Sequence, residues 1–129
     1  MYTSDTCVPF LQFLYMNKRE IGYEHETMAC DFLEHSGLKI LCRNFRVRSG
    51  EIDIIALDGD ILVFAEVKYR SSLDYGGASY AISRQKQNKI IQVAQWFMAK
   101  NKIPQDTYCR FDAVLIDKEE IIHIKNAWQ

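Results

Sequence analysis

The sequence predicts a single α/β domain in which helices cover both faces of a mixed central sheet, in the element order αβββαββ. Two β-favouring runs, at residues 51–57 and 60–68, flank Asp58-Gly59, which is a strong signal for a two-residue hairpin turn. Residues with helical periodicity precede and follow this hairpin. The 129 residues are 48% hydrophobic, enough for one core, and no repeat or linker divides them.

The first fifteen residues are expected to form an N-terminal extension, and residues 16–129 the domain itself. Residues 8–16 are mostly apolar, but Pro9 and Gln12 interrupt them and no basic residue precedes them. This segment is too short to span a bilayer and lacks the basic start of a signal peptide, so no membrane partner is expected. A hydrophobic arm that packs on the domain or on a partner is the competing interpretation.

The first helix is predicted from an apolar stripe that ends before Ser36-Gly37, where glycine favours a helix stop. The stripe consists of Ile21, Met28, Ala29, Phe32 and Leu33. A strand follows at residues 38–47. This strand and the residue after it contain no acid but four basic residues, which are Lys39, Arg43, Arg46 and Arg48. Since the formal net charge is only −1, nucleic-acid binding must come from local basic patches such as this one.

The predicted hairpin brings four charged side chains together at one end. With Asp58-Gly59 as the turn, Asp53 becomes the diagonal neighbour of Glu66, about 7 Å away between backbones. One face of the hairpin is entirely apolar and carries Ile52, Ile54, Ala56, Ile61, Val63, Ala65 and Val67. The other face is apolar near the turn and carries Glu51, Asp53, Glu66 and Lys68 at its far end. Apolar residues on both faces require cover on both sides, as in a three-layer domain.

These charges predict a site for a hard divalent cation. Four charges beside an apolar face are costly unless they compensate one another or bind an ion, and here three acids outnumber one lysine. Oxygen ligands without a supporting histidine or cysteine favour Mg²⁺ or Mn²⁺. An ion held by Asp53 and Glu66 would lower the pKa of a bound water and stabilise charge on phosphorus, and Lys68 could orient that water. Without metal, the crowded carboxylates should bind protons more readily than isolated ones. A solvated cluster of ion pairs is the alternative.

A second basic patch is predicted on a long helix at about residues 79–100. Its buried stripe consists of Ile82, Ile90, Val93, Ala94 and Phe97. Lys86 and Lys89 continue this stripe, so we expect them to border the acidic pocket or to grip phosphate, with Arg84 beside them. Snorkelling from the helix edge is the alternative. Between hairpin and helix, residues 69–77 form a loop in which Arg70 could hold nucleic acid; an ordinary surface connection is the other interpretation.

The remaining segments complete the sheet, and the cysteines indicate the cellular compartment. Residues 109–116 and 120–125 are two strand-like runs joined by a charged turn. The four cysteines, which are Cys7, Cys30, Cys42 and Cys109, have no paired spacing. This pattern argues against a zinc ribbon and indicates a reduced cytoplasm.

The hairpin residues carry a resemblance to a known family. Asp53 with Glu66-Val67-Lys68 resembles the PD-(D/E)XK nuclease signature, in which the acids hold the metal and the lysine assists the water. The longer string at residues 50–68 resembles the bacterial YraN family, which is related in fold to archaeal Holliday-junction resolvases. The resemblance runs from about residue 17 to the C-terminus. It implies a three-layer, restriction-endonuclease-like domain.

The resemblance also implies a glutamate on the first helix that can join the metal site. Glu26 and Ala29 fall in place for it, while His25 replaces a glycine of the family pattern. The alternative for Glu26 is a solvated first-turn residue favoured by the helix dipole. Asp112 belongs to a Phe-Asp-Ala-Val string also seen in the family, and we assign it no catalytic role.

The expected activity is Mg²⁺- or Mn²⁺-dependent endonucleolytic cleavage of DNA, on branched or recombination and repair intermediates. Asp53, Glu66 and Lys68 are the expected catalytic residues, with Glu26 auxiliary. The residues expected to contact nucleic acid are Arg43, Arg46, Arg48, Arg70, Arg84, Lys86 and Lys89. A non-catalytic nucleic-acid-binding module or scaffold in DNA uptake or recombination is the main alternative, and an RNA-directed nuclease is another. Resolvase-like relatives are often dimers, so a homodimer is also considered, although no helical stripe is clearly left over for its interface.

Overall fold

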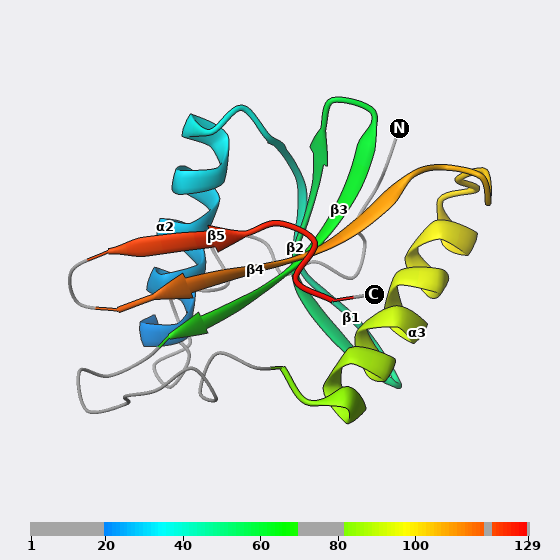
Figure 1. Ribbon diagram of the computed structural model, residues 1–129. Coiled ribbons are helices and arrows are strands. Elements are labelled where there is room, and N and C mark those ends of the chain that lie inside the picture. The colour runs from blue at the N-terminus through cyan, green and yellow to red at the C-terminus, as the bar shows by residue number, and fades with distance from the viewer. Residues whose placement is uncertain (1–19, 70–81, 118–119, 129) are drawn as a thin grey trace.

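The computed structural model describes residues 20–69, 82–117 and 120–128. These ranges contain two helices and five strands in the predicted order (Figure 1). The elements are α2 (Glu20–His35), β1 (Lys39–Val47), β2 (Gly50–Asp58), β3 (Ile61–Tyr69), α3 (Arg84–Lys100), β4 (Cys109–Ile116) and β5 (Ile121–Ile124). The predicted extension at residues 1–15 and the loop residue Arg70 lie outside the described ranges. No helix within those ranges is long and apolar enough to cross a bilayer.

The strands form one mixed sheet in the order β1-β2-β3-β4-β5. Neighbouring strands are antiparallel except β3 and β4, which run parallel. A parallel pair needs a crossover, and the segment that contains α3 supplies it. Figure 1 shows α2 on one side of the sheet and α3 on the other. The predicted three-layer α/β fold is thereby confirmed.

Each helix buries its apolar residues against its own face of the sheet. Helix α3 buries Ile90, Val93, Ala94 and Phe97, as the sequence predicts. The ring of Phe97 makes edge contacts with Phe45 and Phe64, with ring centroids 5.1 and 6.1 Å apart. On the opposite face, a second cluster contains Ala29, Cys30, Leu33, Ile54, Ala56, Val63 and Ala65. The candidate site described below lies at one end of the central strands β2 and β3.

Helix α3 begins at Arg84 rather than near residue 79. Ser83 caps it in an extended conformation, and its Oγ accepts a hydrogen bond from the backbone N of Lys86 at 3.1 Å. Such a cap satisfies one of the donors left open at a helix start. Ile82, expected inside the helix, precedes it and packs beside the α3 core. The cap therefore fixes the backbone that carries Lys86.

The hairpin turn is Gly59-Asp60 rather than the predicted Asp58-Gly59. Asp58 faces Ile61, and the pairing continues to Ile54 and Ala65. Gly59 has a φ of 61°, and glycine at the first central position is typical of a type II′ turn. The Asp-Gly pair suggested a type I′ turn because glycine also suits the second position of that turn. The register is therefore shifted by two residues from the prediction, and its continuation puts Asp53 directly opposite Glu66 instead of diagonal to it.

One hairpin residue lies on the face opposite to the predicted one. Ile52 is buried with Ile55 in the cluster beneath α3, whereas Ile54 belongs to the cluster beneath α2. The alternation along β2 therefore breaks at Asp53, just beyond the last residue that pairs with β3. On the neighbouring strand β1, Asn44 lies level with Asp53 and has a φ of 54°. Both strands are irregular at the level of the charged end.

A buried ion-pair network joins β4, β5 and the hairpin turn. Asp112 is fully buried and accepts hydrogen bonds from Arg110 at 2.8 and 2.9 Å and from the backbone N of Asn126 at 2.9 Å. Nε2 of His123 lies 2.7 Å from the same carboxylate, and Arg110 also pairs with Asp58 at 3.0 Å. Burial raises the pKa of Asp112, but these hydrogen bonds outweigh it and hold the pKa below its usual value. The network accounts for Asp112 as a structural residue.

Candidate active site

Asp53 lies where β2 and β3 part. Its Oδ2 accepts a hydrogen bond from the backbone N of Val67 at 2.8 Å. The regular pairing of β2 with β3 ends at Ile54, the residue next to Asp53. The carboxylate thus takes the place that a backbone carbonyl of β2 would fill in a continued ladder. This hydrogen bond fixes Asp53 beside Glu66, the residue that precedes Val67.

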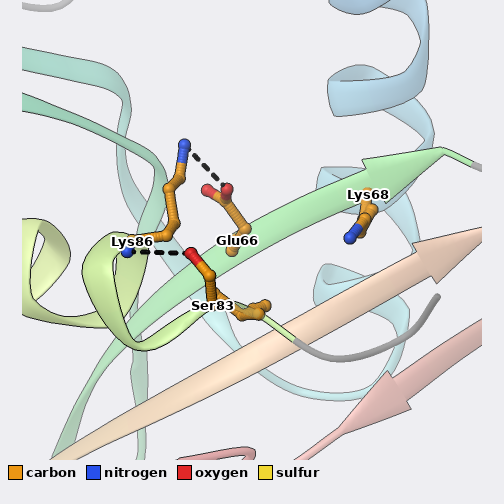
Figure 2. A pocket seen from close by; sticks show the side chains of 5 residues that line it. Glu66, Lys68, Ser83 and Lys86 are labelled. Atoms are coloured by element: carbon orange, nitrogen blue, oxygen red, sulfur yellow. Dashed lines mark hydrogen bonds and ion pairs between the residues drawn. The ribbon is translucent and has the colours of Figure 1, made fainter. Parts of the chain in front are cut away.

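Glu66 points to the start of α3 and meets Lys86 there. The Nζ of Lys86 lies 3.1 Å from Oε2 of Glu66, and the Glu66 side chain is 14% exposed (Figure 2). An open pocket of about 370 Å³ surrounds this pair and is lined by Glu66, Lys68, Ile82, Ser83 and Lys86. Its volume is within the range of ligand pockets in proteins. The structure therefore places Lys86 at the border of the acidic pocket, as the sequence predicts.

Burial and the neighbouring carboxylate raise the pKa of Asp53 well above its usual value. Burial is the largest cause, followed by the negative charge of Glu66 and a hydrogen bond with it. The hydrogen bond from Val67 opposes this shift but does not cancel it. Two carboxylates so close cannot both ionise without cost, so Asp53 binds a proton more readily than an isolated aspartate does. This agrees with the expectation that crowded acids bind protons readily.

The lysines of the pocket supply the compensating positive charge. Burial lowers the pKa of Lys86, but Glu66, Asp53 and Glu51 outweigh it, so that the pKa lies above its usual value. Lys86 is therefore cationic at neutral pH. Lys68 lies two residues beyond Glu66 on β3 and lines the same pocket (Figure 2). Two ammonium groups from two different elements thus line the pocket beside Glu66.

Glu26 lies close to this site but is engaged elsewhere. Its Oε1 accepts a hydrogen bond from Nδ2 of Asn44 at 2.6 Å, and Arg43 lies 3.8 Å away. Burial is the main cause that raises the pKa of Glu26, and the charge of Glu26 in turn contributes to the raised pKa of Asp53. In the described ranges, no three His, Cys, Asp or Glu side chains are placed to hold one ion. The structure therefore does not bring Glu26 into one ligand set with Asp53 and Glu66.

Asn44 is a site residue that the sequence analysis missed. It is buried, with only 3% of its surface exposed, and its left-handed backbone lies level with Asp53. Asparagine tolerates this conformation better than most residues with a side chain. A single asparagine within the apolar and basic run at residues 38–47 was the available signal. Through its bond with Glu26, Asn44 connects helix α2 to the irregular strand.

The predicted basic patch on β1 is divided by ion pairs. Nη2 of Arg43 donates to Thr27 at 3.1 Å, and Nε of Arg46 donates to Glu51 at 2.9 Å. Glu51 is thereby explained as the partner of Arg46. The side chains of Arg48, Arg84 and Lys89 are exposed. Among the described residues that were expected to contact nucleic acid, the exposed ones therefore lie at the β1–β2 turn and in the first turns of α3.

The donor set fits a hard divalent cation. Asp53 and Glu66 offer carboxylate oxygens, and Mg²⁺ is commonly held by one or two carboxylates together with waters and substrate phosphates. Carboxylate ligands must be deprotonated, so a bound cation would oppose the proton binding that burial and Glu66 favour at Asp53. The soft ligands that select zinc are absent from the residues that line the pocket.

Comparison with known proteins places the site inside a shared sequence. A family model described as uncharacterised protein family UPF0102 matches residues 25–116, which include every residue that lines the pocket. A UPF0102 protein of Lachnoclostridium phytofermentans is 47% identical over 113 residues, which are 88% of this chain and 96% of that protein. One from Dechloromonas aromatica is 46% identical over 107 residues, which are 83% and 87% of the two chains. One from Francisella tularensis is 45% identical over 114 residues, which are 88% and 97%.

Proposed function

The chain belongs to the UPF0102 family, which is the YraN family that its sequence resembles, and we propose that it is a divalent-metal-dependent endonuclease. The observation that carries the proposal is the pair of Asp53 and Glu66, held together where two strands part, with two lysines that line the pocket beside Glu66. A crowded acidic pair beside a cationic rim is suited to bind a metal ion and a phosphate together. The cytoplasmic location expected from the cysteines stays a prediction.

Asp53 and Glu66 are the residues that would hold Mg²⁺ or Mn²⁺. When bound, the ion would lower the pKa of a water and stabilise the charge that develops on phosphorus. Lys86 is engaged with Glu66 in the metal-free protein. If Glu66 held a metal ion, the ammonium of Lys86 would be available to a phosphate oxygen. Lys68 supplies the second ammonium of the pocket and is suited to orient the attacking water.

In this proposal Glu26 is a positioning residue and does not contact the reacting atoms. It holds Asn44, whose φ of 54° maintains the irregular strand level with Asp53. The irregularity coincides with the point where Asp53 leaves the regular ladder and reaches Val67. Loss of Glu26 should therefore displace Asp53.

DNA is the proposed substrate because the family resemblance leads to resolvase-like enzymes that act on branched DNA. The site itself recognises a phosphodiester, and the same chemistry serves RNA. The substrate range is therefore part of the test. Purified protein is incubated with linear, branched and single-stranded DNA and with RNA, in Mg²⁺, Mn²⁺ or EDTA.

We expect cleavage by the wild type in Mg²⁺ or Mn²⁺, none in EDTA, and none by the Asp53→Ala/Glu66→Ala double variant. Asp60→Asn is the matched control, because it removes an exposed acid at the opposite end of the same hairpin. This variant should cut like the wild type. If wild type and double variant behave alike on every substrate, the catalytic proposal fails.

A non-catalytic binding module is the second candidate. The observation that favours it is the 3.1 Å pair of Glu66 and Lys86, because an internal ammonium already neutralises part of the acidic site. A binder would retain its affinity for nucleic acid in the double variant, and neither protein would cut. An active nuclease would lose turnover in the double variant.

A further inference from the structure

The two helices carry opposite charge. Helix α2 contains five acidic residues and no lysine or arginine. Helix α3 contains four basic residues and no acid in seventeen positions. The helices cover opposite faces of the sheet (Figure 1). Helix α3 by itself therefore attracts a polyanion and helix α2 repels one, although the whole chain has a formal charge of only −1.

One side of α3 carries a polar stripe that ends in an exposed tryptophan. Residues at helical spacings of four, three and four lie along one line of the helix, and they are Gln85, Lys89, Gln92 and Trp96. All four are exposed. The Trp96 side chain is 60% exposed, whereas the adjacent Phe97 is fully buried. The described part of the domain leaves most of the Trp96 side chain exposed, on a stripe that carries amide and cationic groups.

This stripe begins beside the candidate active site. Lys86, the residue after Gln85, is the residue that meets Glu66. A Cβ atom on Gly50 would lie 4.0 Å from the Cβ of Lys89, so the β1–β2 turn packs against the same part of the helix. That turn carries the exposed Arg48. Arg48 and Lys89 thus extend the positive rim of the pocket towards Trp96.

We propose that a nucleic-acid strand runs from the pocket along this stripe of α3 and that one of its unpaired bases stacks on Trp96. The inference rests on the proposed nucleic-acid substrate and specifies its class. Ten residues separate Lys86 from Trp96, which is about 15 Å along the helix. At the roughly 3.4 Å per nucleotide of a fully stacked strand, this span corresponds to at most about four nucleotides from the phosphate at Lys86, and to fewer where the strand is extended.

The unpaired state of the base follows from the chemistry of stacking. Bases inside a duplex are already stacked on their neighbours, so an exposed aromatic side chain gains most from a base that is splayed out. Phosphates of the same strand find cations and amide donors along the stripe and no acid on the helix. The preferred substrate is therefore single-stranded or branched, with an unpaired segment next to the cleaved bond.

The test measures binding rather than cleavage. Single-stranded, branched and fully paired DNA oligonucleotides are titrated in EDTA, where no metal-dependent cleavage occurs, into the wild type, Trp96→Leu and Trp96→Phe. Tyr108→Leu is the matched control, because Tyr108 is 79% exposed and lies just before β4, off helix α3. Lys89→Gln tests the positive rim of the pocket, and its control is Lys125→Gln, because Lys125 has a 60% exposed side chain and lies just after β5, off helix α3.

We expect Trp96→Leu to weaken binding of single-stranded and branched DNA by about fivefold or more. Trp96→Phe should retain most of the affinity, and Tyr108→Leu should retain all of it. The chain has two tryptophans, and the second, Trp128, is only 7% exposed. Bound single strands should therefore protect the fluorescence of Trp96 from acrylamide in the wild type.

Equal binding of single strands by Trp96→Leu and the wild type would overturn the inference, as would a wild type that binds none of the oligonucleotides. Weakened self-association of Trp96→Leu, with unchanged DNA binding, would assign the surface to a second copy of the chain and would also overturn it. The cleavage assay separates this inference from the proposed function. If the wild type binds DNA through Trp96 but does not cleave it, only the proposed hydrolysis is refuted. If the wild type cleaves DNA but its DNA binding does not depend on Trp96, only the stacking surface is refuted.

Discussion

Asp53 should destabilise the metal-free protein at neutral pH, and Asp53→Asn should remove that penalty. The raised pKa means that the folded state binds a proton at Asp53 more tightly than the unfolded state does. Asparagine keeps an oxygen that can accept the hydrogen bond from Val67 and carries no charge. The variant should therefore fold as well as the wild type and be more stable in EDTA.

The direction of the pH dependence follows from the raised pKa. Below the unfolded pKa of about 3.9, both states are protonated at Asp53 and the penalty is absent. As the pH rises through that value, the unfolded carboxyl ionises first, so the wild type loses stability relative to the variant. The loss continues until the pH passes the folded pKa, and the difference is constant above it.

The size of the effect can be bounded from the same linkage. Each tenfold difference in proton affinity between the folded and unfolded states is worth about 1.4 kcal/mol. Since the shift at Asp53 is large, Asp53→Asn should add at least about 1.4 kcal/mol of unfolding free energy at pH 8. For a domain of this size, such a gain raises Tm by about 5 °C.

The assay is thermal and urea unfolding in EDTA from pH 4 to pH 9, repeated with Mn²⁺. Mn²⁺ at a hundred times its Kd should stabilise the wild type by about 2.7 kcal/mol and leave Asp53→Asn nearly unchanged. Asp60→Asn is the control, and as an exposed turn substitution it should stay within about 0.5 kcal/mol of the wild type. The reasoning is refuted if Asp53→Asn is less stable than the wild type in EDTA at pH 8.

Three further predictions concern the residues around the site. Asp112→Asn should cost about 3 kcal/mol in urea unfolding, because Arg110 then faces a neutral amide in the buried network. Since the pKa of Asp112 is lowered, this difference should be present above the unfolded pKa and shrink as the pH falls through the folded pKa. Asn44→Ala should be less stable than Asn44→Gly by about 1 kcal/mol, because both lose the bond to Glu26 and only alanine is strained at a φ of 54°. Lys86→Gln should bind Mn²⁺ more tightly in calorimetry, since its ammonium no longer competes for the carboxylate 3.1 Å away.

Each of these predictions has a contrary result. An Asp112→Asn variant with the wild-type urea midpoint would remove the structural role of that network. Equal stability of Asn44→Ala and Asn44→Gly would show that the left-handed backbone is not maintained in solution. Weaker Mn²⁺ binding by Lys86→Gln would mean that Lys86 supports the metal site instead of competing for it.

The layers of the fold were predictable because they depend on periodicity. Apolar residues at alternating positions define the central strands, and the spacing of Ile90, Val93 and Phe97 defines the face of α3 that is buried. The meeting of Asp53 and Glu66 was also predictable, since both lie on the same end of one hairpin. These features follow from local sequence alone.

The exact geometry was not predictable, because it depends on choices that the pattern leaves open. Glycine in the turn suits either a type I′ or a type II′ hairpin, so the pairing differs from the prediction by two residues. The break at Asp53, which turns Ile52 to the α3 face, arises from tertiary contacts across strands. The alternation of apolar and polar residues in the sequence does not indicate such a break.

The partners of the charged residues were the part of the structure that the sequence predicted least well. Arg43 and Arg46 were assigned to nucleic acid, but they pair with Glu26 and Glu51. These contacts join an arginine to an acid on another element, and the sequence gives no distance between them. The opposite charges of α2 and α3 become meaningful only once the helices are known to cover opposite faces.

The central claim is that Asp53 and Glu66 form a metal-dependent nuclease site. Its most direct test is cleavage of one labelled branched DNA by the wild type, Asp53→Asn and Asp60→Asn, with Mn²⁺ titrated from zero. The account predicts metal-dependent cleavage by the wild type and Asp60→Asn, and none by Asp53→Asn although that variant is folded and more stable. Cleavage by Asp53→Asn at the wild-type rate would contradict it.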